Sequence, residues 1–265
     1  MTIQFKILKT LLNILSPIAP KWVGKIGYFV FSMSPKLKVK PHHLKFFNSS
    51  IQSSIDVNGI KVQVYQWGSG EQKVLLLHGW ASSSFWWRHH IKTLTEAGFK
   101  VYALDAPGNG LSEGRRLTIM LYAAAVKVLY AHSFGGFVAL YLCKELGLDF
   151  TKKVAVLGSP DKALLFFDNF SARVGFSNTT KQAIIHEFTR RFGHPPEYFD
   201  TSRFSKEVKA KGLIIHDRDD EDTPFECAVH LSEAWPEAQF FITEGLGHAL
   251  KSPIVYQEVL KFASK

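Results

Sequence analysis

Strand-like and helix-like segments alternate along most of the chain after residue 55. Short apolar runs such as 74–77 are typical of strands buried on both faces of a sheet, and amphipathic segments such as 85–97 are typical of helices that pack on it. The same patterns predict strands at 100–104, 153–157, 213–216 and 239–243, and helices at 137–146, 224–235 and 253–263. This alternation predicts an α/β fold with a mostly parallel, doubly wound sheet and helices on both faces.

A β-hairpin is predicted just before these segments. Asn58 and Gly59 supply the two residues of a tight turn, and apolar and polar side chains alternate around it. The lysine-rich residues 36–45 are expected to be a solvated linker. We therefore divide the chain into an N-terminal helical extension and linker over residues 1–50 and a main domain over residues 51–265.

Residues 3–33 carry two apolar stripes at helical spacing, separated by Pro17 and Pro20. The first stripe is formed by Phe5, Leu8, Leu12 and Leu15. Lys21 and Lys25 interrupt the run of about 18 apolar residues that a membrane span needs, so no span is expected. We expect two helices that pack on the body of the protein. The alternative is peripheral membrane contact, with residues 3–33 lying as a basic amphipathic anchor on a membrane surface.

The chain has 265 residues and a formal net charge of +9, from 32 Lys and Arg against 23 Asp and Glu. The basic residues are spread out, with a mild excess before residue 46, whereas a nucleic-acid-binding protein gathers them on one face or in one tail. We therefore expect no nucleic-acid partner, and we interpret the charge first as a surface property and second as affinity for anionic membranes. Cys143 and Cys227 form no CxxC pair, which indicates buried thiols and predicts a cytoplasmic protein, with membrane association as the alternative.

Ser133 lies in a pattern that favours a sharp turn between a strand and a helix. The residues two positions away on either side are Ala131 and Gly135, and such small residues let the backbone before and after the turn approach closely. The turn would expose the Ser133 hydroxyl and aim the backbone N–H of Phe134 at negative charge. The alternative is a loop serine whose neighbouring glycines only begin a helix, and the pattern alone does not decide between them.

Four further polar stretches follow the ends of predicted strands, at residues 78–80, 105–112, 216–224 and 245–248. The carboxyl ends of parallel strands meet at one edge of the sheet, where ligands bind in such folds, so we expect these stretches to gather near Ser133. Taken in this order, the five motifs resemble the α/β-hydrolase family over residues 55–263. The resemblance implies the chain order nucleophile, acid, histidine.

Carried over onto matching positions, the resemblance implies that Ser133 is the nucleophile. It implies that His248 is the base, which takes the serine proton and later returns it to the leaving group. The backbone N–H groups of Trp80 and Phe134 would form the oxyanion hole, in which one donor lowers the barrier by about 3–4 kcal/mol. His78 is expected to be a structural residue that supports the oxyanion loop.

The acid is expected in the stretch 216–224. The family pattern His-Gly-x-x-Asp-x-x-Val-Pro aligns with this stretch and implies that Asp220 orients His248. Asp219 and Asp222 stay open as alternatives. The chain departs from the pattern at Asp217, where the family usually has Gly.

The alternation of strands and helices stops between residues 160 and 211. Helical patterns at 163–174 and 180–192 match a short helical cap inserted after the sixth strand, over about residues 161–210. Its apolar side chains would either line the site or attach the cap to the body. An apolar cap favours an acyl or aryl ester over a charged substrate.

These patterns together predict a serine hydrolase that cleaves a carboxylic ester or related acyl substrate through an acyl-enzyme intermediate. No cofactor is expected, and neither an HExxH nor a GxxxxGK pattern indicates a metal or phosphate site. A serine nucleophile argues against epoxide-hydrolase chemistry, because family members with that activity use Asp there. The sequence indicates no oligomeric state.

The alternative is a catalytically idle family member that binds a small ligand or a partner. Residues 117–132 contain no Gly, Pro, Asn, Asp or Ser to mark the turn between a helix expected at 118–126 and a strand expected at 127–132. This connection is tighter than the usual length of about 2–6 residues. A distorted strand there would misplace Ser133, which is the main support for the idle alternative.

Overall fold

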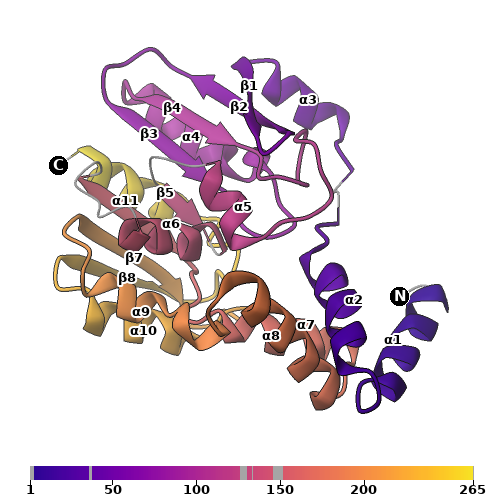
Figure 1. Ribbon diagram of the computed structural model, residues 1–265. Coiled ribbons are helices and arrows are strands. Elements are labelled where there is room, and N and C mark those ends of the chain that lie inside the picture. Colours follow the sequence, from indigo (N-terminus) through magenta and orange to yellow (C-terminus); the bar gives the residue numbers. More distant parts are fainter. Residues whose placement is uncertain (1–2, 36–37, 126–129, 133, 146–151, 265) are drawn as a thin grey trace. The chain divides into compact units, whose positions relative to one another are not determined.

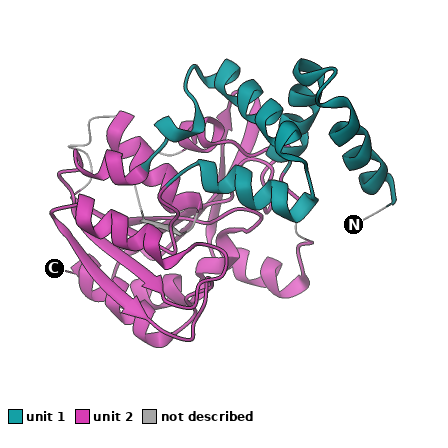
Figure 2. Cartoon of the chain, turned by 90° about the horizontal axis from the view of Figure 1, so that it is seen from below, with its two compact units in different colours: residues 1–33, 162–200 teal, residues 34–161, 201–265 magenta. Residues whose placement is uncertain are grey.

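The computed structural model describes residues 3–35, 38–125, 130–132, 134–145 and 152–264 (Figure 1). The chain divides into two compact units, which Figure 2 shows in different colours. The smaller unit combines residues 1–33 with 162–200, and the larger unit combines residues 34–161 with 201–265. The tight connection predicted within residues 117–132 falls on residues 126–129, which lie outside the described residues.

The larger unit is built on one eight-stranded sheet with the strand order β1-β2-β4-β3-β5-β6-β7-β8. The strands are β1 (Ile51–Val57), β2 (Ile60–Trp67), β3 (Lys73–Leu77), β4 (Lys100–Leu104), β5 (Tyr130–His132), β6 (Lys153–Leu157), β7 (Lys211–Asp217) and β8 (Ala238–Thr243). The β1–β2 and β2–β4 pairs are antiparallel, and every pair from β4 to β8 is parallel. The predicted α/β fold with a mostly parallel sheet is confirmed.

Helices cover both faces of this sheet. They are α3 (Pro41–Phe47), α4 (Arg88–Glu96), α5 (Ile119–Ala124), α6 (Phe134–Glu145), α9 (Thr201–Ser205), α10 (Phe225–Ala234) and α11 (Pro253–Ser264), with the 3₁₀ helix η1 (Ser84–Trp87) before α4. Helices α4 and α11 share a hydrophobic core with side chains from one face of the sheet. Helix α6 lies on the opposite face (Figure 1) and is buried along most of its length. A parallel sheet covered on both faces explains the continuous apolar runs of its strands.

The hairpin of β1 and β2 turns at Asn58 and Gly59, as predicted. Both residues have positive φ angles, 54° and 77°, which a two-residue hairpin turn of this kind requires. Asn and Gly adopt this left-handed conformation more readily than other residues, so the local sequence determines the register of the hairpin.

The expectation of a solvated linker over residues 36–45 is wrong from residue 41 onward, where α3 begins. Pro41 stands at the first turn of the helix, where a missing N–H costs nothing. Phe47 stacks on Tyr65 with 4.5 Å between ring centroids, and Phe46 lies 5.1 Å from a ring of Trp67. Packing of the buried Phe47 and the partly buried Phe46 against β2 stabilises the helix in spite of the neighbouring lysines.

The smaller unit is helical. It contains α1 (Ile3–Leu15), α2 (Pro20–Ser32), α7 (Leu164–Val174), α8 (Asn178–Phe192) and the 3₁₀ helix η2 (Pro196–Tyr198). Its core buries Leu12 of α1, Val23 of α2 and Ala183 of α8, so the N-terminal helices pack on part of the segment predicted to be a cap. Among the described residues, no helix is long and apolar enough to cross a membrane.

Aromatic side chains of the segment predicted to be a cap pack against α2 within this unit. Phe167 stacks on Phe31 of α2 at 4.4 Å between ring centroids, and Phe170 meets the same ring edge-on at 5.2 Å. These two side chains therefore attach the 162–200 segment to α2.

His90 is a buried histidine in α4, and neither of its ring nitrogens has a hydrogen-bond partner among the described residues. Its ring lies 4.6–5.6 Å from those of Trp86, Trp87 and Tyr256. Burial among these aromatic rings, with a smaller contribution from His89, lowers the pKa of His90 to about 3. The imidazole is therefore neutral in the folded protein at neutral pH.

This buried histidine predicts a loss of stability in mild acid. The unfolded chain binds a proton at His90 near pH 6.5, whereas the folded protein resists it down to about pH 3, so the free energy of unfolding falls as the pH drops through this range. At pH 5 the loss is about 2 kcal/mol. Urea unfolding at pH 7.5 and pH 5 should show this loss in the wild type and a smaller pH dependence in His90→Leu. In the control His186→Leu, at an exposed histidine, the free energy of unfolding should depend on pH as it does in the wild type. If His90→Leu also kept the full wild-type pH dependence, the conclusion that His90 is buried in its neutral form would be contradicted.

Candidate active site

The sequence-predicted stretches follow the carboxyl ends of parallel strands. Residues 78–80 follow β3, residues 105–112 follow β4, and residues 245–248 follow β8, while Asp217 ends β7. Ser133 stands in the sequence between the end of β5 and the start of α6, but it lies outside the described residues. The contact of Ser133 with the other site residues therefore stays a prediction.

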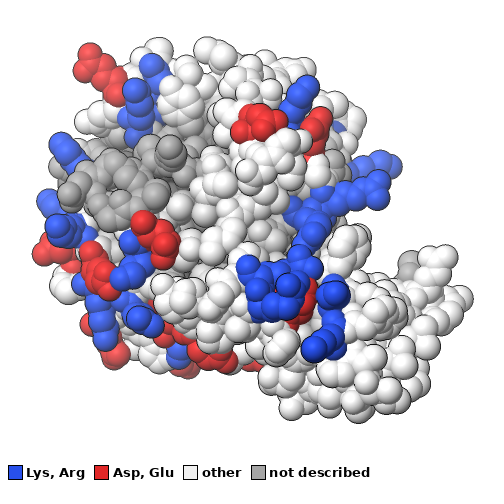
Figure 3. All heavy atoms as spheres, in the orientation of Figure 1, with Lys and Arg blue, Asp and Glu red and all other residues white. Residues whose placement is uncertain are grey.

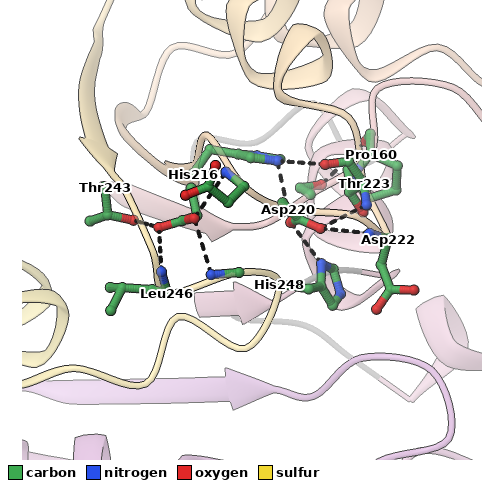
Figure 4. A network of polar contacts seen from close by, with 12 residues as sticks. Pro160, His216, Asp220, Asp222, Thr223, Thr243, Leu246 and His248 are labelled. Atoms are coloured by element: carbon green, nitrogen blue, oxygen red, sulfur yellow. Dashed lines mark hydrogen bonds and ion pairs between the residues drawn. The ribbon is translucent and has the colours of Figure 1, made fainter.

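Asp220 and His248 are brought together by the loops after β7 and β8 (Figure 4). The ring Nδ1–H of His248 donates a hydrogen bond to Oδ2 of Asp220 at 2.8 Å. The other oxygen of Asp220 accepts from the backbone N–H groups of Asp222 at 3.0 Å and Thr223 at 2.8 Å. The Asp220 side chain is fully buried, while that of His248 keeps 22% of its surface exposed. A fixed carboxylate thus holds an imidazole that solvent or a ligand can reach.

Asp220, the carboxylate that the family pattern implied, is hydrogen-bonded to His248. The carboxylate of Asp219 instead accepts a hydrogen bond from the backbone N–H of Gly245 at 2.8 Å. His216 lies behind Asp220, where its Nε2–H donates to the carbonyl oxygen of Thr223 at 2.9 Å. The same Nε2 lies 3.4 Å from Oδ2 of Asp220, so this carboxylate lies between two imidazoles. Burial lowers the pKa of His216, so this second imidazole is neutral at neutral pH.

Gly158, directly after β6, lies beside this pair and was not anticipated from the sequence. Its φ angle is +56°, which favours glycine. A Cβ at this position would lie 3.4 Å from both Asp220 Oδ2 and His248 Nδ1. The signal in the sequence was only a glycine after an apolar run, which is common at strand ends.

Asp217 holds the loop that carries His248. Its buried carboxylate accepts four hydrogen bonds at 2.6–3.0 Å, from Thr243 Oγ1 and from the backbone N–H groups of Asp219, Leu246 and Gly247. Burial alone would raise the pKa of Asp217, but these bonds outweigh it, so its pKa lies below the ordinary value and the group is charged. The residue that departs from the family pattern thus fixes the backbone immediately before His248.

The role of Asp217 predicts that Asp217→Asn loosens this loop. An amide would place an NH₂ group against backbone N–H donors and would remove the charge, so the free energy of unfolding should fall by about 2–3 kcal/mol. Urea unfolding measures this loss, and hydrogen exchange should become faster at the amides of Leu246 and Gly247. The control Glu244→Gln, at an exposed residue of the same loop, should change stability by less than about 0.5 kcal/mol. Unchanged exchange at both amides in Asp217→Asn would contradict this role.

The residues predicted for the oxyanion hole lie next to each other. The rings of Trp80 and Phe134 meet edge-to-face with 5.7 Å between centroids. Helix α6 also approaches the end of β3 closely, because a Cβ on Gly135 would lie 2.7 Å from the carbonyl oxygen of Leu77. This close approach explains the requirement for glycine two residues after Ser133. The use of the two backbone N–H groups as an oxyanion hole stays a prediction.

His78 has the structural role that was expected of it. Its buried ring accepts a hydrogen bond from the backbone N–H of Ala106 at 2.9 Å and donates one to the carbonyl oxygen of Gly79 at 2.7 Å. Burial lowers the pKa of His78, so the neutral ring joins the loops after β3 and β4. Tyr122 of α5, which was not anticipated, donates from its hydroxyl to the carbonyl oxygen of His78 at 2.9 Å. Helix α5 is therefore attached to the loop that carries Trp80.

Among the residues described above, no group of three or more His, Cys, Asp or Glu side chains is arranged to hold a metal ion.

The family is established by a match over residues 74–258, which fit the model of the alpha/beta hydrolase family. This stretch covers well over half of the chain and includes β3 from its second residue, β4 to β8, Asp220 and His248. The chain belongs to the alpha/beta hydrolase family.

Curated relatives match over short segments only. Epoxide hydrolase A of Mycobacterium tuberculosis is 39% identical over 57 residues, which is 21% of this chain and 18% of that protein. Bifunctional epoxide hydrolase 2 of Rattus norvegicus is 42% identical over 52 residues, which is 20% of this chain and 9% of that protein. The match thus spans less than a fifth of the length of either relative.

Solved structures show a similar fold over most of the chain. A bromoperoxidase from Bacillus anthracis has a TM-score of 0.62 and 19% identity, and the likeness covers 81% of this chain and 100% of that one. A thioesterase domain from the curacin biosynthetic pathway has a TM-score of 0.61 and 13% identity, with 82% and 100% covered. A meta-cleavage product hydrolase from Pseudomonas fluorescens IP01 has a TM-score of 0.58 and 18% identity, with 80% and 97% covered. At these identities the likeness concerns the fold alone.

Proposed function

We propose that this chain is a serine hydrolase that cleaves a carboxylic ester or a related acyl substrate. The observation that carries the proposal is the 2.8 Å hydrogen bond from His248 Nδ1 to the buried carboxylate of Asp220. This bond places the ring proton on Nδ1, so Nε2 is the ring atom that can accept a proton, as a general base must.

The strand register supports a position for Ser133 near this pair. Strand β5 runs parallel to β6, and His132 pairs with Leu157. The residue directly after β6 is Gly158, at which a Cβ would lie 3.4 Å from His248 Nδ1. Ser133 follows His132 in the sequence, and we propose that it stands at the edge of the sheet at which the base is held.

In the proposed mechanism the hydroxyl oxygen of Ser133 forms a bond to the acyl carbon while Nε2 of His248 takes its proton. Asp220 stays ionised and stabilises the imidazolium. The backbone N–H groups of Trp80 and Phe134 donate to the oxyanion. Collapse of the tetrahedral intermediate breaks the bond to the leaving group, which takes the proton from His248. Water then attacks the acyl carbon while His248 takes its proton. The bond between the acyl carbon and the Ser133 oxygen breaks, this oxygen takes the proton back from His248, and the carboxylic acid is released.

The curated relatives are epoxide hydrolases, so epoxide opening is a second candidate activity. The serine at position 133 argues against it. The family resemblance implies an Asp nucleophile for that chemistry, whose ester intermediate water can cleave. A serine oxygen that opened an epoxide would instead form an ether, which water does not cleave under the same conditions. Ser133 therefore favours acyl transfer.

A fluorophosphonate probe tests the proposal, because it reacts with an activated serine and not with an ordinary hydroxyl. We expect covalent labelling of Ser133 in the folded chain, located by peptide mass spectrometry, and no labelling of Ser133→Ala. Asp220→Asn should slow labelling by about 10³–10⁴-fold, since His248 would lose the partner that fixes its tautomer.

Asp219→Asn is the matched control, since Asp219 lies one residue away and does not contact His248; it should be labelled within a few-fold of the wild-type rate. A folded wild-type chain that leaves Ser133 unlabelled would overturn the proposal and favour the catalytically idle alternative.

A further inference from the structure

The positive charge of the chain is concentrated in its first 55 residues. This segment contains eight Lys and no Asp or Glu, so the other 210 residues carry 24 Lys and Arg against 23 Asp and Glu. The first 55 residues thus supply +8 of the net charge of +9. The distribution is far more uneven than the mild excess expected above.

Exposed apolar side chains are concentrated in the same segment. Eight of the 15 large hydrophobic residues that are exposed within the described chain lie between residues 3 and 33. These eight form what we call the N-terminal apolar face: Ile3, Ile7, Leu11, Ile14, Ile18, Trp22, Phe29 and Met33. The four on α1 recur at intervals of three or four residues, which places them on one side of the helix.

The opposite faces of these helices are already occupied. Leu12 and Val23 are fully buried in the core of the smaller unit. A Cβ on Gly24 would overlap the carbonyl oxygen of Ala183, and one on Gly27 would overlap Ile184, so α2 lies directly against α8. Helices α1 and α2 therefore have one face that packs inside the unit and a second apolar face that is left in solvent.

Exposed lysines are sequence neighbours of residues in the N-terminal apolar face. Lys6 of α1 and both Lys21 and Lys25 of α2 are exposed, and Trp22 lies between the last two in the sequence. Figure 3 shows the surface over α1 without acidic side chains. Exposed apolar residues, a tryptophan and lysines without acids are the composition of a helix that lies in the interface of a membrane.

We propose that the N-terminal apolar face docks on the surface of an anionic lipid bilayer. The apolar side chains would enter the boundary between headgroups and acyl chains, and Lys6, Lys21 and Lys25 would lie at the level of the lipid phosphates. Charge complementarity selects this occupant over a second copy of the chain, because a symmetric dimer through this face would bring two segments of +8 together. The proposal does not depend on the hydrolase activity.

Co-sedimentation of the full chain with lipid vesicles tests this proposal. We expect binding to vesicles of phosphatidylcholine mixed with phosphatidylserine, and weaker binding both at high salt and to phosphatidylcholine alone. The double variant Ile7→Gln, Ile14→Gln should lower the partition coefficient by at least about tenfold. The double variant Lys21→Gln, Lys25→Gln should lower it by about fivefold for each lysine.

The matched control is Ile51→Gln with Ile254→Gln, at two exposed isoleucines of the larger unit. It should bind as the wild type does, and circular dichroism should show that all variants keep their helix content. Equal binding by the wild type and both N-terminal variants would overturn the proposal, and so would no binding to the anionic vesicles. A wild-type dimer in sedimentation velocity that Ile7→Gln, Ile14→Gln abolishes would also overturn it, because a second copy would then cover the face.

Discussion

A buried carboxylate has to be hydrogen-bonded, and this requirement organises the loops at the carboxyl end of β7. Asp220 accepts from two backbone N–H groups of its own loop and from the imidazole of His248 on the next loop. Asp217, three residues earlier, accepts four hydrogen bonds, three of which come from residues 243–247. Asp217 and Asp220 thus join the loops after β7 and β8 near His248, and Asp219 adds a further bond to Gly245 of the second loop.

Close approach of the backbone imposes the second constraint on this region. Gly135 lets the start of α6 lie against the end of β3, and Gly158 leaves space beside the pair of Asp220 and His248. A side chain at either position would push apart segments that the proposed reaction needs together. The sheet supplies the directions of the strands, but these glycines set how near the loops come to one another.

Local patterns were sufficient to predict the strands and the hairpin turn, because each depends on residues that are near in sequence. Asp220 was a candidate only through the resemblance to a family pattern over residues 216–224. The role of Asp217 could not be seen in the same way, since three of its partners lie 26–30 residues further along the chain. Helix α3 was missed because its many lysines indicated a solvated segment. The stabilising contacts of Phe46 and Phe47 are made with rings of β2, which is separate in the sequence, so the local pattern did not reveal them. The packing of α2 on α8 is likewise a long-range contact, and Gly24 gave no local sign of it.

The hydrogen bond between His248 and Asp220 can be measured directly by NMR of protein labelled with ¹⁵N-histidine. We expect a protected, strongly downfield ring proton on Nδ1 of His248 in the wild type, because a charged carboxylate accepts it. Asp220→Asn should move this proton upfield or lose it to exchange with water, whereas Asp219→Asn should leave it in place. A wild-type His248 whose Nδ1–H exchanges freely with water would contradict the pairing on which the proposed site is built.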